Sequence, residues 1–423
     1  MSRVAVIGTG YVGLTTGAYL AHLGHHVICA DVVEEKVELL QQGKIPILEA
    51  GLEDLVREGL DGGRLTFVLG AANAVPDAEF VFLCVPTPQA EDGSADLSFI
   101  EDAAREIGPF LGPETVVINK STVPVGSTRV VEQALGRDDV SVISNPEFLR
   151  EGSAVHDSLH PDRIVIGGDD QAAAIRVASL FEELQAPLIV TSPASAEVIK
   201  YASNAFLATK ISFVNAVANL CEAVGADVRE VVLGMGYDKR IGFEFLRPGP
   251  GWGGSCFPKD TRALVRIAED AGYDFGLLKG VIQVNDEQIE RVTGKVERLA
   301  GGSVDGVTVA VWGLTFKART DDLRNSPSLE VISRLRRRGA MVRAFDPTVH
   351  APIDGIEICP DPYAACEGAA VLALLTEWDE FRWLDFDKVK AALARPAIFD
   401  ARNLLDPAAL RRYGFTYEGL GRA

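Results

Sequence analysis

The chain lacks three features that would point to particular classes of protein. It has fewer basic than acidic residues, 41 Lys and Arg against 60 Asp and Glu, for a formal net charge of −19. A field of that sign repels nucleic acid and anionic membrane surfaces, so we expect neither as a partner. No apolar run approaches the ~18 residues of a membrane-spanning helix. The cysteines, six in 423 residues, form no CxxC pair and no metal-ligand spacing, which predicts free thiols and no metal.

The length and the first residues bear on the number of domains and on where the protein is located. A chain of 423 residues exceeds what one compact core usually holds, which predicts two or three domains. The first residues enter an apolar strand at Arg3 without the pattern of a secretory signal peptide. We therefore expect a soluble, cytoplasmic protein. The negative charge still leaves room for a small anionic ligand that a few local cations hold.

Residues 3–31 have the pattern of a dinucleotide-binding unit, with an apolar strand, a glycine turn, an Ala- and Leu-rich helix and a second strand. Gly8, Gly10 and Gly13 form GxGxxG at the turn, where the helix N-terminus offers free N–H groups to a pyrophosphate. Asp31, about 20 residues further on, would accept the ribose hydroxyls and repel a 2′-phosphate, which favours NAD over NADP. The alternative, glycines that serve only a tight turn, fits this context poorly.

Further strand-and-helix units follow, and polar side chains come at their strand ends. Residues 80–88 and 115–135 each pass from an apolar strand into a loop. Ligands of a doubly wound sheet bind beyond the carboxyl ends of the strands, so Thr87 and Thr122 are predicted to face the cofactor. The alternative for the second of these loops is a plain connection with a helix cap.

Two glutamates, Glu147 and Glu151, follow the next strand in the segment 140–157. Paired carboxylates usually lie on a solvated surface. Their place at a strand end of a cofactor domain favours acid/base or ligand-positioning work instead. A last unit at 163–193 completes a first domain, which we place at 1–194.

The composition changes after Ser195, where helical periodicity replaces strand signals up to about Ala300. A long helix begins this region and is a candidate dimer interface, and a second helical stretch starts at about Thr261. Lys200 and Asn204 lie one turn apart on the long helix, in an Ala-rich, apolar context. Such surroundings favour a buried polar pair directed at a ligand over a solvated lysine. We place this central domain at 195–302.

The segment 248–260, PGPGWGGSCFPKD, presents a cysteine among glycines and prolines. Backbone without Cβ atoms lets a ligand approach Cys256 closely. Lys259 would favour its thiolate, and Asp260 would handle a proton. The alternative is an inert, buried cysteine in a surface turn. Arg240 and Arg247, just upstream, suit a phosphate-bearing substrate.

The last domain, 303–423, returns to strands and helices. Residues 307–347 mirror 4–31, with Gly313 at the turn and a second strand that ends in Asp346. This weak internal repeat predicts a second nucleotide-type ligand. Candidate contacts in and after the repeat are Phe316, Lys317, Arg324 and Arg402, whereas the arginines at 336–338 are predicted to be a solvated helix end.

Motifs along nearly the whole chain, in order, resemble those of the UDP-glucose 6-dehydrogenase family of nucleotide-sugar dehydrogenases. They are GTGYVG, CVPTP, STVPVG, NPEFLREG, KYASN, RIGFEFLRPGPGWGGSCFPKD, GLTFK and FDARN. The resemblance implies an α/β fold of two Rossmann-like doubly wound parallel-sheet domains joined by a central helical domain with a long helix. It also implies a homodimer built on the central helices.

The implied reaction is NAD-dependent, four-electron oxidation of UDP-glucose to UDP-glucuronate at C6. Cys256 would form a thiohemiacetal and then a thioester, with Lys200 and Asn204 stabilising the oxyanion. Asp260 would assist deprotonation and, with Thr122, hold water, and Glu147 would act as acid/base in hydrolysis. NAD would contact Gly8, Gly10, Tyr11, Val12, Gly13, Asp31, Lys36, Thr87, Thr122, Glu151 and Arg324. The sugar nucleotide would contact Phe148, Leu149, Glu151, Lys200, Asn204, Phe245, Arg247, Gly253, Phe316, Lys317 and Arg402, with Arg240 reaching the substrate of a neighbouring subunit.

Other functions stay open beside this one. Sister enzymes act on GDP-mannose or UDP-N-acetylmannosamine, although serine before Cys256 resembles the UDP-glucose branch more than the GGHC form. Arg247 stands where many members have lysine, which keeps the charge and changes the geometry of a phosphate contact. A non-catalytic NAD and nucleotide-sugar sensor would share the fold. A two-electron hydroxyacid dehydrogenase would need neither Cys256 nor the domain at 303–423.

Overall fold

The computed structural model describes residues 1–88 and 95–422, which group into two compact units. The first unit is Met1–Ser203 with Arg262–Ala271, and the second is Asn204–Thr261 with Gly272–Ala423. Two of these boundaries fall inside helices, α8 (Pro193–Val224) and α10 (Phe257–Asp270). The three-domain division at 194 and 302 stays a prediction.

The first unit is built on a sheet of eight strands in the order β3-β2-β1-β4-β5-β6-β7-β8. Neighbouring strands are parallel, except that β6 and β7 meet at one antiparallel bridge. The order reverses between β1 and β4, and a doubly wound sheet binds its ligand beyond the carboxyl ends at such a point. The strands are β1 (Arg3–Ile7), β2 (His26–Asp31), β3 (Leu65–Leu69), β4 (Phe80–Leu83), β5 (Val116–Asn119), β6 (Ser141–Ser144), β7 (Ile164–Gly167) and β8 (Leu188–Thr191).

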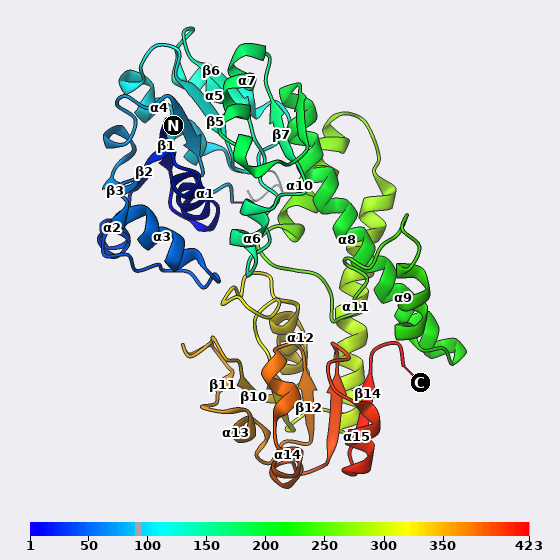
Figure 1. The fold of residues 1–423 in the computed structure, drawn as a ribbon. Helices are drawn as coiled ribbons and strands as arrows, with labels where there is room; N and C mark the ends of the chain where they lie inside the picture. The colour runs from blue at the N-terminus through cyan, green and yellow to red at the C-terminus, as the bar shows by residue number, and fades with distance from the viewer. Residues whose placement is uncertain (89–94, 423) are drawn as a thin grey trace. The chain divides into compact units, whose positions relative to one another are not determined.

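Helices cover both faces of this sheet (Figure 1). Val4 and Val6 of β1 pack with α1, α2, α3 and α7, whereas Ala5 and Ile7 pack on the opposite face with α4 and α5. Burial on two faces explains why β1, β4 and β5 read as continuous apolar runs. The helices are α1 (Tyr11–His22), α2 (Glu34–Gln41), α3 (Leu52–Asp61), α4 (Ser98–Ile107), α5 (Ser127–Leu135), α6 (Ala154–Leu159) and α7 (Gln171–Ser179).

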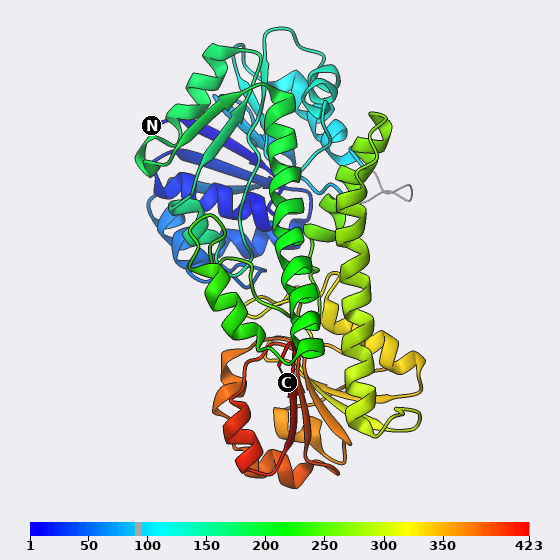
Figure 2. The same ribbon diagram turned by 90° about the vertical axis from the view of Figure 1, so that its right-hand side faces the viewer.

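The second unit holds a parallel sheet in the order β11-β10-β9-β12-β13-β14. One face packs against α11 and α12, and the other against α13, α14 and α15 (Figure 2). The predicted doubly wound repeat is thereby confirmed. Its strands are β9 (Thr308–Trp312), β10 (Met341–Phe345), β11 (Glu357–Ile358), β12 (Val371–Leu374), β13 (Ala397–Asp400) and β14 (Thr416–Gly419), and its helices α11 (Gly276–Ala300), α12 (Pro327–Arg337), α13 (Pro362–Cys366), α14 (Phe386–Ala392) and α15 (Pro407–Arg412).

The regular elements of the central region are helices, with no strand between Thr191 and Thr308, a stretch that the structure describes in full. The long helix α8 has 32 residues, and α9 (Val228–Gly236) follows it. The single stretch expected from Thr261 is wrong, because α10 and α11 are separate helices. Gly272, at φ +76°, adopts the left-handed conformation that ends a helix. Over residues 1–88 and 95–422, no helix is long and apolar enough to cross a membrane.

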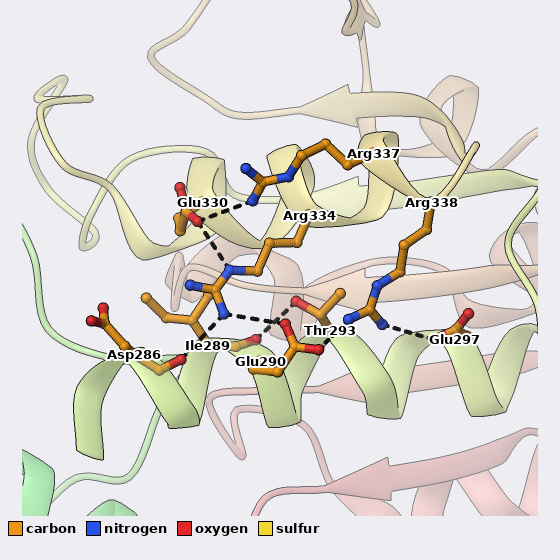
Figure 3. Close-up of polar contacts among 9 residues, drawn as sticks. All are labelled: Asp286, Ile289, Glu290, Thr293, Glu297, Glu330, Arg334, Arg337 and Arg338. Atoms are coloured by element: carbon orange, nitrogen blue, oxygen red, sulfur yellow. Dashed lines mark hydrogen bonds and ion pairs between the residues drawn. The ribbon is translucent and has the colours of Figure 1, made fainter. Parts of the chain in front are cut away.

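Arginines at the end of α12 pair with acidic residues of α11 (Figure 3). Arg338 contacts both Glu290 and Glu297, and Arg334 lies 3.2 Å from Glu290. Arg337 has 66% of its side chain exposed. Within the described part of the chain, its ion pair is with the carboxylate of Glu330 on its own helix. The predicted solvated helix end therefore describes Arg337, whereas Arg338 joins α12 to α11 because its side chain reaches two carboxylates that lie two turns apart on α11.

Candidate active site

The turn between β1 and α1, residues 8–13, is shaped by its glycines. Gly8 has a φ of +91°, and a Cβ there would lie 2.8 Å from the carbonyl oxygen of Cys84. A Cβ on Gly13 would overlap the carbonyl oxygen of Gly8, so α1 can begin this close to the strand only without a side chain. A Cβ on Gly10 would meet nothing within 4 Å. That open space at the start of α1 is a cradle that fits the pyrophosphate of NAD.

Asp31, at the end of β2, is an ionised acceptor beside this turn. One carboxylate oxygen accepts hydrogen bonds from the Thr9 amide at 2.9 Å, the Thr9 hydroxyl at 2.6 Å and Lys36 Nζ at 2.8 Å. Burial alone would raise the pKa of Asp31, but these hydrogen bonds and the charge of Lys36 outweigh burial and hold the pKa at about 2. A carboxylate that stays charged suits ribose hydroxyls and disfavours a 2′-phosphate.

The loops after β4 and β5 are tied together near the same sheet edge. The Thr87 hydroxyl donates to the carbonyl of Thr122 at 2.9 Å, and the Ser121 hydroxyl donates to the carbonyl of Val85 at 2.7 Å. Glu197 of α8 accepts from the amides of Gly126 and Thr128, at 2.6 and 3.0 Å, at the start of α5. The sequence did not single out Glu197; an acid inside an apolar helix was the available signal.

Glu147 and Lys200 form a buried ion pair in the first unit. Lys200 Nζ donates to the backbone carbonyl of Glu147 at 2.6 Å and to its carboxylate at 2.8 Å, and the Leu149 amide donates to the other carboxylate oxygen at 2.6 Å. Burial would raise the pKa of Glu147, but the charge and hydrogen bond of Lys200, the Leu149 amide and the charge of Lys120 lower it overall. Glu147 is therefore held as a carboxylate.

Lys120 is a second buried lysine here, and the sequence analysis missed it. Its Nζ donates to Asn145 Oδ1 at 2.9 Å, and Asn145 Nδ2 in turn donates to the carbonyl of Val165 at 2.8 Å. Burial lowers the pKa of Lys120 to about 8, against the charges of Cys84 and Glu147, which raise it. A lysine that follows a buried strand directly was the signal that could have found it.

Phe148, in the segment after β6, lies next to two cationic side chains. The Arg163 guanidinium lies 3.5 Å from its ring centroid, and Lys200 Nζ lies 5.5 Å from it. Arg150 pairs with Asp157 at 2.6 Å. The predicted ligand residues Phe148, Leu149 and Glu151 are thus all half-buried on a segment whose backbone is anchored on both sides.

Cys256, in the second unit, is half-buried, whereas the other five cysteines are buried. It immediately precedes α10, and its carbonyl accepts the Asp260 amide at 2.8 Å in the first turn of that helix. Partial positive charge at a helix N-terminus favours a thiolate. Burial raises the pKa of the Cys84 thiol to about 12.

Asp260 and Asn204 are buried beside the cysteine segment 248–260. Asn204 Nδ2 donates to one Asp260 carboxylate oxygen at 2.6 Å, and Lys259 Nζ lies 3.2 Å from the other. Asp260 is 0% exposed and Asn204 is 8% exposed. An amide of α8 and the carboxylate and ammonium of two adjacent residues of α10 are thereby brought together.

Side chains of α8 and α11 hold the cysteine segment. The Gly249 amide donates to Asn215 Oδ1 at 2.9 Å, and the Trp252 amide donates to Asn285 Oδ1 at 2.7 Å. Trp252 Nε1 donates to Ser212 Oγ at 2.9 Å. The sequence analysis missed these supports; polar residues spaced three apart on apolar helix faces, as in Ser212 and Asn215, were the signal.

The loop after β9 approaches the same segment closely. A Cβ on Gly253 would overlap the carbonyl oxygen of Asn325, and one on Gly254 would lie 2.9 Å from the Phe316 ring. Lys317 Nζ lies 5.4 Å from the Phe316 ring centroid, and Arg402 donates to the Phe316 carbonyl at 3.2 Å. The structure thus brings four predicted substrate residues to one place in this unit, namely Gly253, Phe316, Lys317 and Arg402.

Other predicted residues lie at the periphery of the second unit. Arg240 and Arg324 have 89% and 63% of their side chains exposed and pair with Asp238 and Asp322. Arg247 is exposed, and Phe245, at φ +64°, lies 6.2 Å from the Phe257 ring. Within the described chain, no cluster of three or more His, Cys, Asp or Glu is placed to hold a metal ion.

The chain matches three domains of one family. Residues 2–185 match its NAD binding domain, 194–287 its central domain and 310–407 its UDP binding domain. The UDP-glucose 6-dehydrogenase TuaD of Bacillus subtilis is 45% identical over 100% of this chain and 94% of its own length.

Two solved structures share the fold. A UDP-glucose dehydrogenase from Pyrobaculum islandicum has a TM-score of 0.91 at 38% identity, covering 100% of this chain and 98% of its own. A UDP-D-ManNAc dehydrogenase from Pyrococcus horikoshii has a TM-score of 0.89 at 27% identity, covering 99% of both chains. The chain is an NAD-dependent oxidoreductase that belongs to the UDP-glucose/GDP-mannose dehydrogenase family.

Proposed function

We propose that this enzyme oxidises the C6 alcohol of UDP-glucose to the carboxylate of UDP-glucuronate through a covalent bond to Cys256. The observation that carries the proposal is the environment of Cys256, which is half-buried at the start of α10 while every other cysteine is buried. Overall, one alcohol, one water and two NAD⁺ give one carboxylate, two NADH and three protons. An alcohol dehydrogenase that stopped at the aldehyde would need no nucleophile.

Cys256 acts on the aldehyde that the first oxidation leaves. Its thiolate adds to the C6 carbonyl carbon to give a thiohemiacetal, and loss of a hydride and a proton from this adduct gives a thioester. NAD, when bound, supplies the hydride acceptor for both oxidations. Water then adds to the thioester, and the carboxylate forms as the C–S bond breaks and returns the thiol. The enzyme thereby keeps the aldehyde bound until it is fully oxidised.

The surrounding side chains are proposed to move protons and stabilise charge. Lys200 and Asn204 stabilise the oxygen anion of the adduct, since both are buried donors in low-dielectric surroundings. Asp260 assists deprotonation and holds water with Thr122. Glu147 serves as acid/base in hydrolysis, and its lowered pKa supports the basic form at the start of that step.

The residues that resemble the family's ligand contacts are proposed to bind the ligands. NAD is held by the turn at 8–13 with Asp31, Lys36, Thr87, Thr122, Glu151 and Arg324. The sugar nucleotide is held by Phe148, Leu149, Glu151, Lys200, Asn204, Phe245, Arg247, Gly253, Phe316, Lys317 and Arg402. The aromatic ring and two cations gathered at Phe316, Lys317 and Arg402 support a nucleotide diphosphate there.

A homodimer is also proposed, with α8 in its interface and Arg240 reaching the partner's substrate. Phe206, Phe213 and Leu220 are 65%, 54% and 59% exposed. They are spaced seven apart, so they form one apolar stripe on α8. Phe213→Glu is expected to shift the mass in sedimentation from dimer to monomer, and an unchanged mass would exclude this stripe. The predicted cytoplasmic location stays a prediction.

The test is the number of NADH formed per sugar, with limiting UDP-glucose and excess NAD. We expect two NADH per sugar from the unmodified enzyme. Cys256→Ser should fail to complete turnover, whereas the neighbouring Ser255→Ala, which keeps the thiol, should still give two. One NADH per sugar together with a fully active Cys256→Ser variant would overturn the covalent route.

If no NADH forms with UDP-glucose, the proposed substrate is wrong, but the family assignment is unaffected. GDP-mannose and UDP-N-acetylmannosamine are then the substrates to try, and the structural likeness to a UDP-D-ManNAc dehydrogenase supports the second. If none of the three sugars gives NADH while NAD still binds, a non-catalytic sensor would be favoured.

A further inference from the structure

Glu49 is a buried acid that belongs to none of the motifs in the cofactor unit. It lies in the connection between α2 and α3 and is 5% exposed. One carboxylate oxygen accepts from the Tyr11 hydroxyl and from the Gly152 amide, the latter at 2.6 Å, and the other accepts from the Ala154 amide at 2.8 Å. Three donors from two distant parts of the chain thus meet on one side chain.

These donors belong to two regions of the first unit, the glycine turn and the segment that carries Glu147. Tyr11 is the first residue of α1, in the glycine turn that is proposed to bind NAD. Gly152 and Ala154 come at the end of the segment that carries Glu147 and leads from β6 to α6. The Gly152 amide also lies 2.9 Å from the Tyr11 hydroxyl, so the two parts touch directly as well as through Glu49.

The segment between β6 and α6 is therefore held at both ends. At its start, Lys200 binds the carbonyl and the carboxylate of Glu147. At its end, Glu49 binds the amides of Gly152 and Ala154. Gly152 has a φ of +79°, a conformation that strongly favours glycine, so the chain at this contact has one defined path. A shift of Tyr11 would move the far end of the segment, and with it the backbone of Glu147.

A carboxylate is the group that this contact requires. Its two oxygens accept several hydrogen bonds at once, and bonds from amides to a charged acceptor are among the stronger ones in proteins. Glutamine has the same shape, but it has one acceptor oxygen and replaces the other with an NH₂ donor. In Glu49→Gln at least one of the buried donors would face another donor.

We infer that Glu49 is a positioning residue that couples occupancy of the NAD-binding turn to the placement of the Glu147 segment. The role of Glu147 in hydrolysis rests on the proposed function, but the coupling does not. Glu49 would itself contact neither the sugar nor the reacting atoms. Its effect on the reaction is to place Glu147 correctly once NAD is present.

Hydrogen exchange tests the coupling without any substrate. In the unmodified enzyme, NAD alone should slow exchange of the amides at 147–156 by about fivefold or more, the lower end of typical coupling between sites. In Glu49→Gln, NAD should still bind and protect the glycine turn, and the slowing at 147–156 should disappear. Glu53→Gln, a change at an exposed acid in the first turn of α3, is the matched control and should behave like the unmodified enzyme.

Two results would overturn the inference. Equal NAD-dependent slowing at 147–156 in Glu49→Gln and the unmodified enzyme would show that Glu49 couples nothing. Slowing absent from the unmodified enzyme would show that no coupling exists. Tyr11→Phe removes one donor and keeps the carboxylate, so it should reduce the slowing partly, and it decides the question if Glu49→Gln does not fold.

Mass spectrometry during turnover then tests the consequence for chemistry. If Glu147 is misplaced, Glu49→Gln should accumulate a sugar adduct on Cys256, with kcat lowered about tenfold and the KM for UDP-glucose little changed. A variant with normal exchange coupling and no adduct contradicts the positioning role. An unmodified enzyme that forms neither NADH nor adduct contradicts the proposed function instead, and leaves the exchange result standing.

Discussion

The turns after β1 and β9 share a backbone geometry and differ in their use. Gly8 and Gly313 both have a φ of +91°. The Gly8 amide donates to the carbonyl of Ala30 at 2.8 Å, and the Gly313 amide donates to that of Phe345 at 2.9 Å. In each case the acceptor belongs to the neighbouring parallel strand, so the weak sequence repeat corresponds to a real structural one.

The two aspartates that end the second strand of each repeat show the difference. Asp31, with 9% of its side chain exposed, accepts from Thr9 and Lys36 on one oxygen and from the Val33 amide on the other at 3.2 Å. Asp346 is 1% exposed, and one of its oxygens accepts from the Leu314 amide at 2.7 Å and from Trp378 Nε1 at 3.1 Å. The same position is thus a proposed ribose contact in the first sheet and an internal hydrogen-bond acceptor in the second.

The helices that follow the turns differ as well. α1 begins at Tyr11, directly behind the glycine turn, whereas α12 begins at Pro327, well after Gly313. The second sheet therefore has no helix N-terminus at its turn to receive a phosphate. Its longer loop instead carries Phe316 and Lys317, which are proposed substrate contacts.

The largest effect is expected from adding a side chain to a glycine of the turn after β1. Gly13→Ala places a Cβ on the carbonyl of Gly8, and we expect a loss of about 3 kcal/mol in the free energy of unfolding together with loss of NAD binding. Gly10→Ala meets no atom of the protein, so its stability should change by less than about 1 kcal/mol while NAD affinity falls at least about tenfold. Urea unfolding and NAD titration measure both quantities. Equal stability of the two variants would contradict this division of roles.

Replacing the aspartate that ends the second strand of each repeat should affect stability in one case and NAD affinity in the other. Asp346→Asn puts an NH₂ group against buried donors, so we expect about 2 kcal/mol of destabilisation and no change in NAD affinity. Asp31→Asn should cost little stability and weaken NAD binding about tenfold, since it removes a charged ribose acceptor. Thermal unfolding with and without NAD compares the two. A shift of NAD affinity in Asp346→Asn would mean that the second repeat also contributes to the NAD site.

Lys120 tests the buried charge at the strand ends of the first sheet. Its pKa is about 8 in the folded protein and 10.5 as an ordinary lysine, so between these pH values the unfolded chain binds the extra proton. Stability should therefore rise with pH across that window, by about 2 kcal/mol relative to Lys120→Met. Urea unfolding of both proteins at about pH 7.5 and about pH 10 measures the difference. Parallel pH profiles would show that Lys120 titrates normally.

The smallest effect is expected where α12 meets α11 on the second sheet. Arg338→Met removes partly exposed ion pairs to Glu290 and Glu297 and should lower the free energy of unfolding by about 0.5–1 kcal/mol. The effect should shrink in high salt, which screens such pairs. Arg337→Met is the control, because its exposed contact with Glu330 should be worth less. A larger loss from Arg337 than from Arg338 would contradict the contacts in Figure 3.

Local patterns were enough to predict much of this protein. The glycine turn, the long helix, the repeat around Gly313 and the half-buried cysteine follow from spacing and backbone chemistry, which act over a few residues. The break between α10 and α11 was missed because Gly272 competes with strong helical periodicity on both sides. Lys120, Glu49 and Glu197 were missed because each gains its meaning from partners far away in the chain.

The sequence by itself determined the class of fold and the choice of cofactor, and it singled out the cysteine that is proposed as the nucleophile. Only the tertiary structure decided which polar side chains are buried together. Glu147 meets Lys200, and Glu49 meets Tyr11 and Gly152, across long separations in the chain. The physical reason is that burial makes each charge depend on its partners, and only the packed fold sets which partners are within hydrogen-bonding distance.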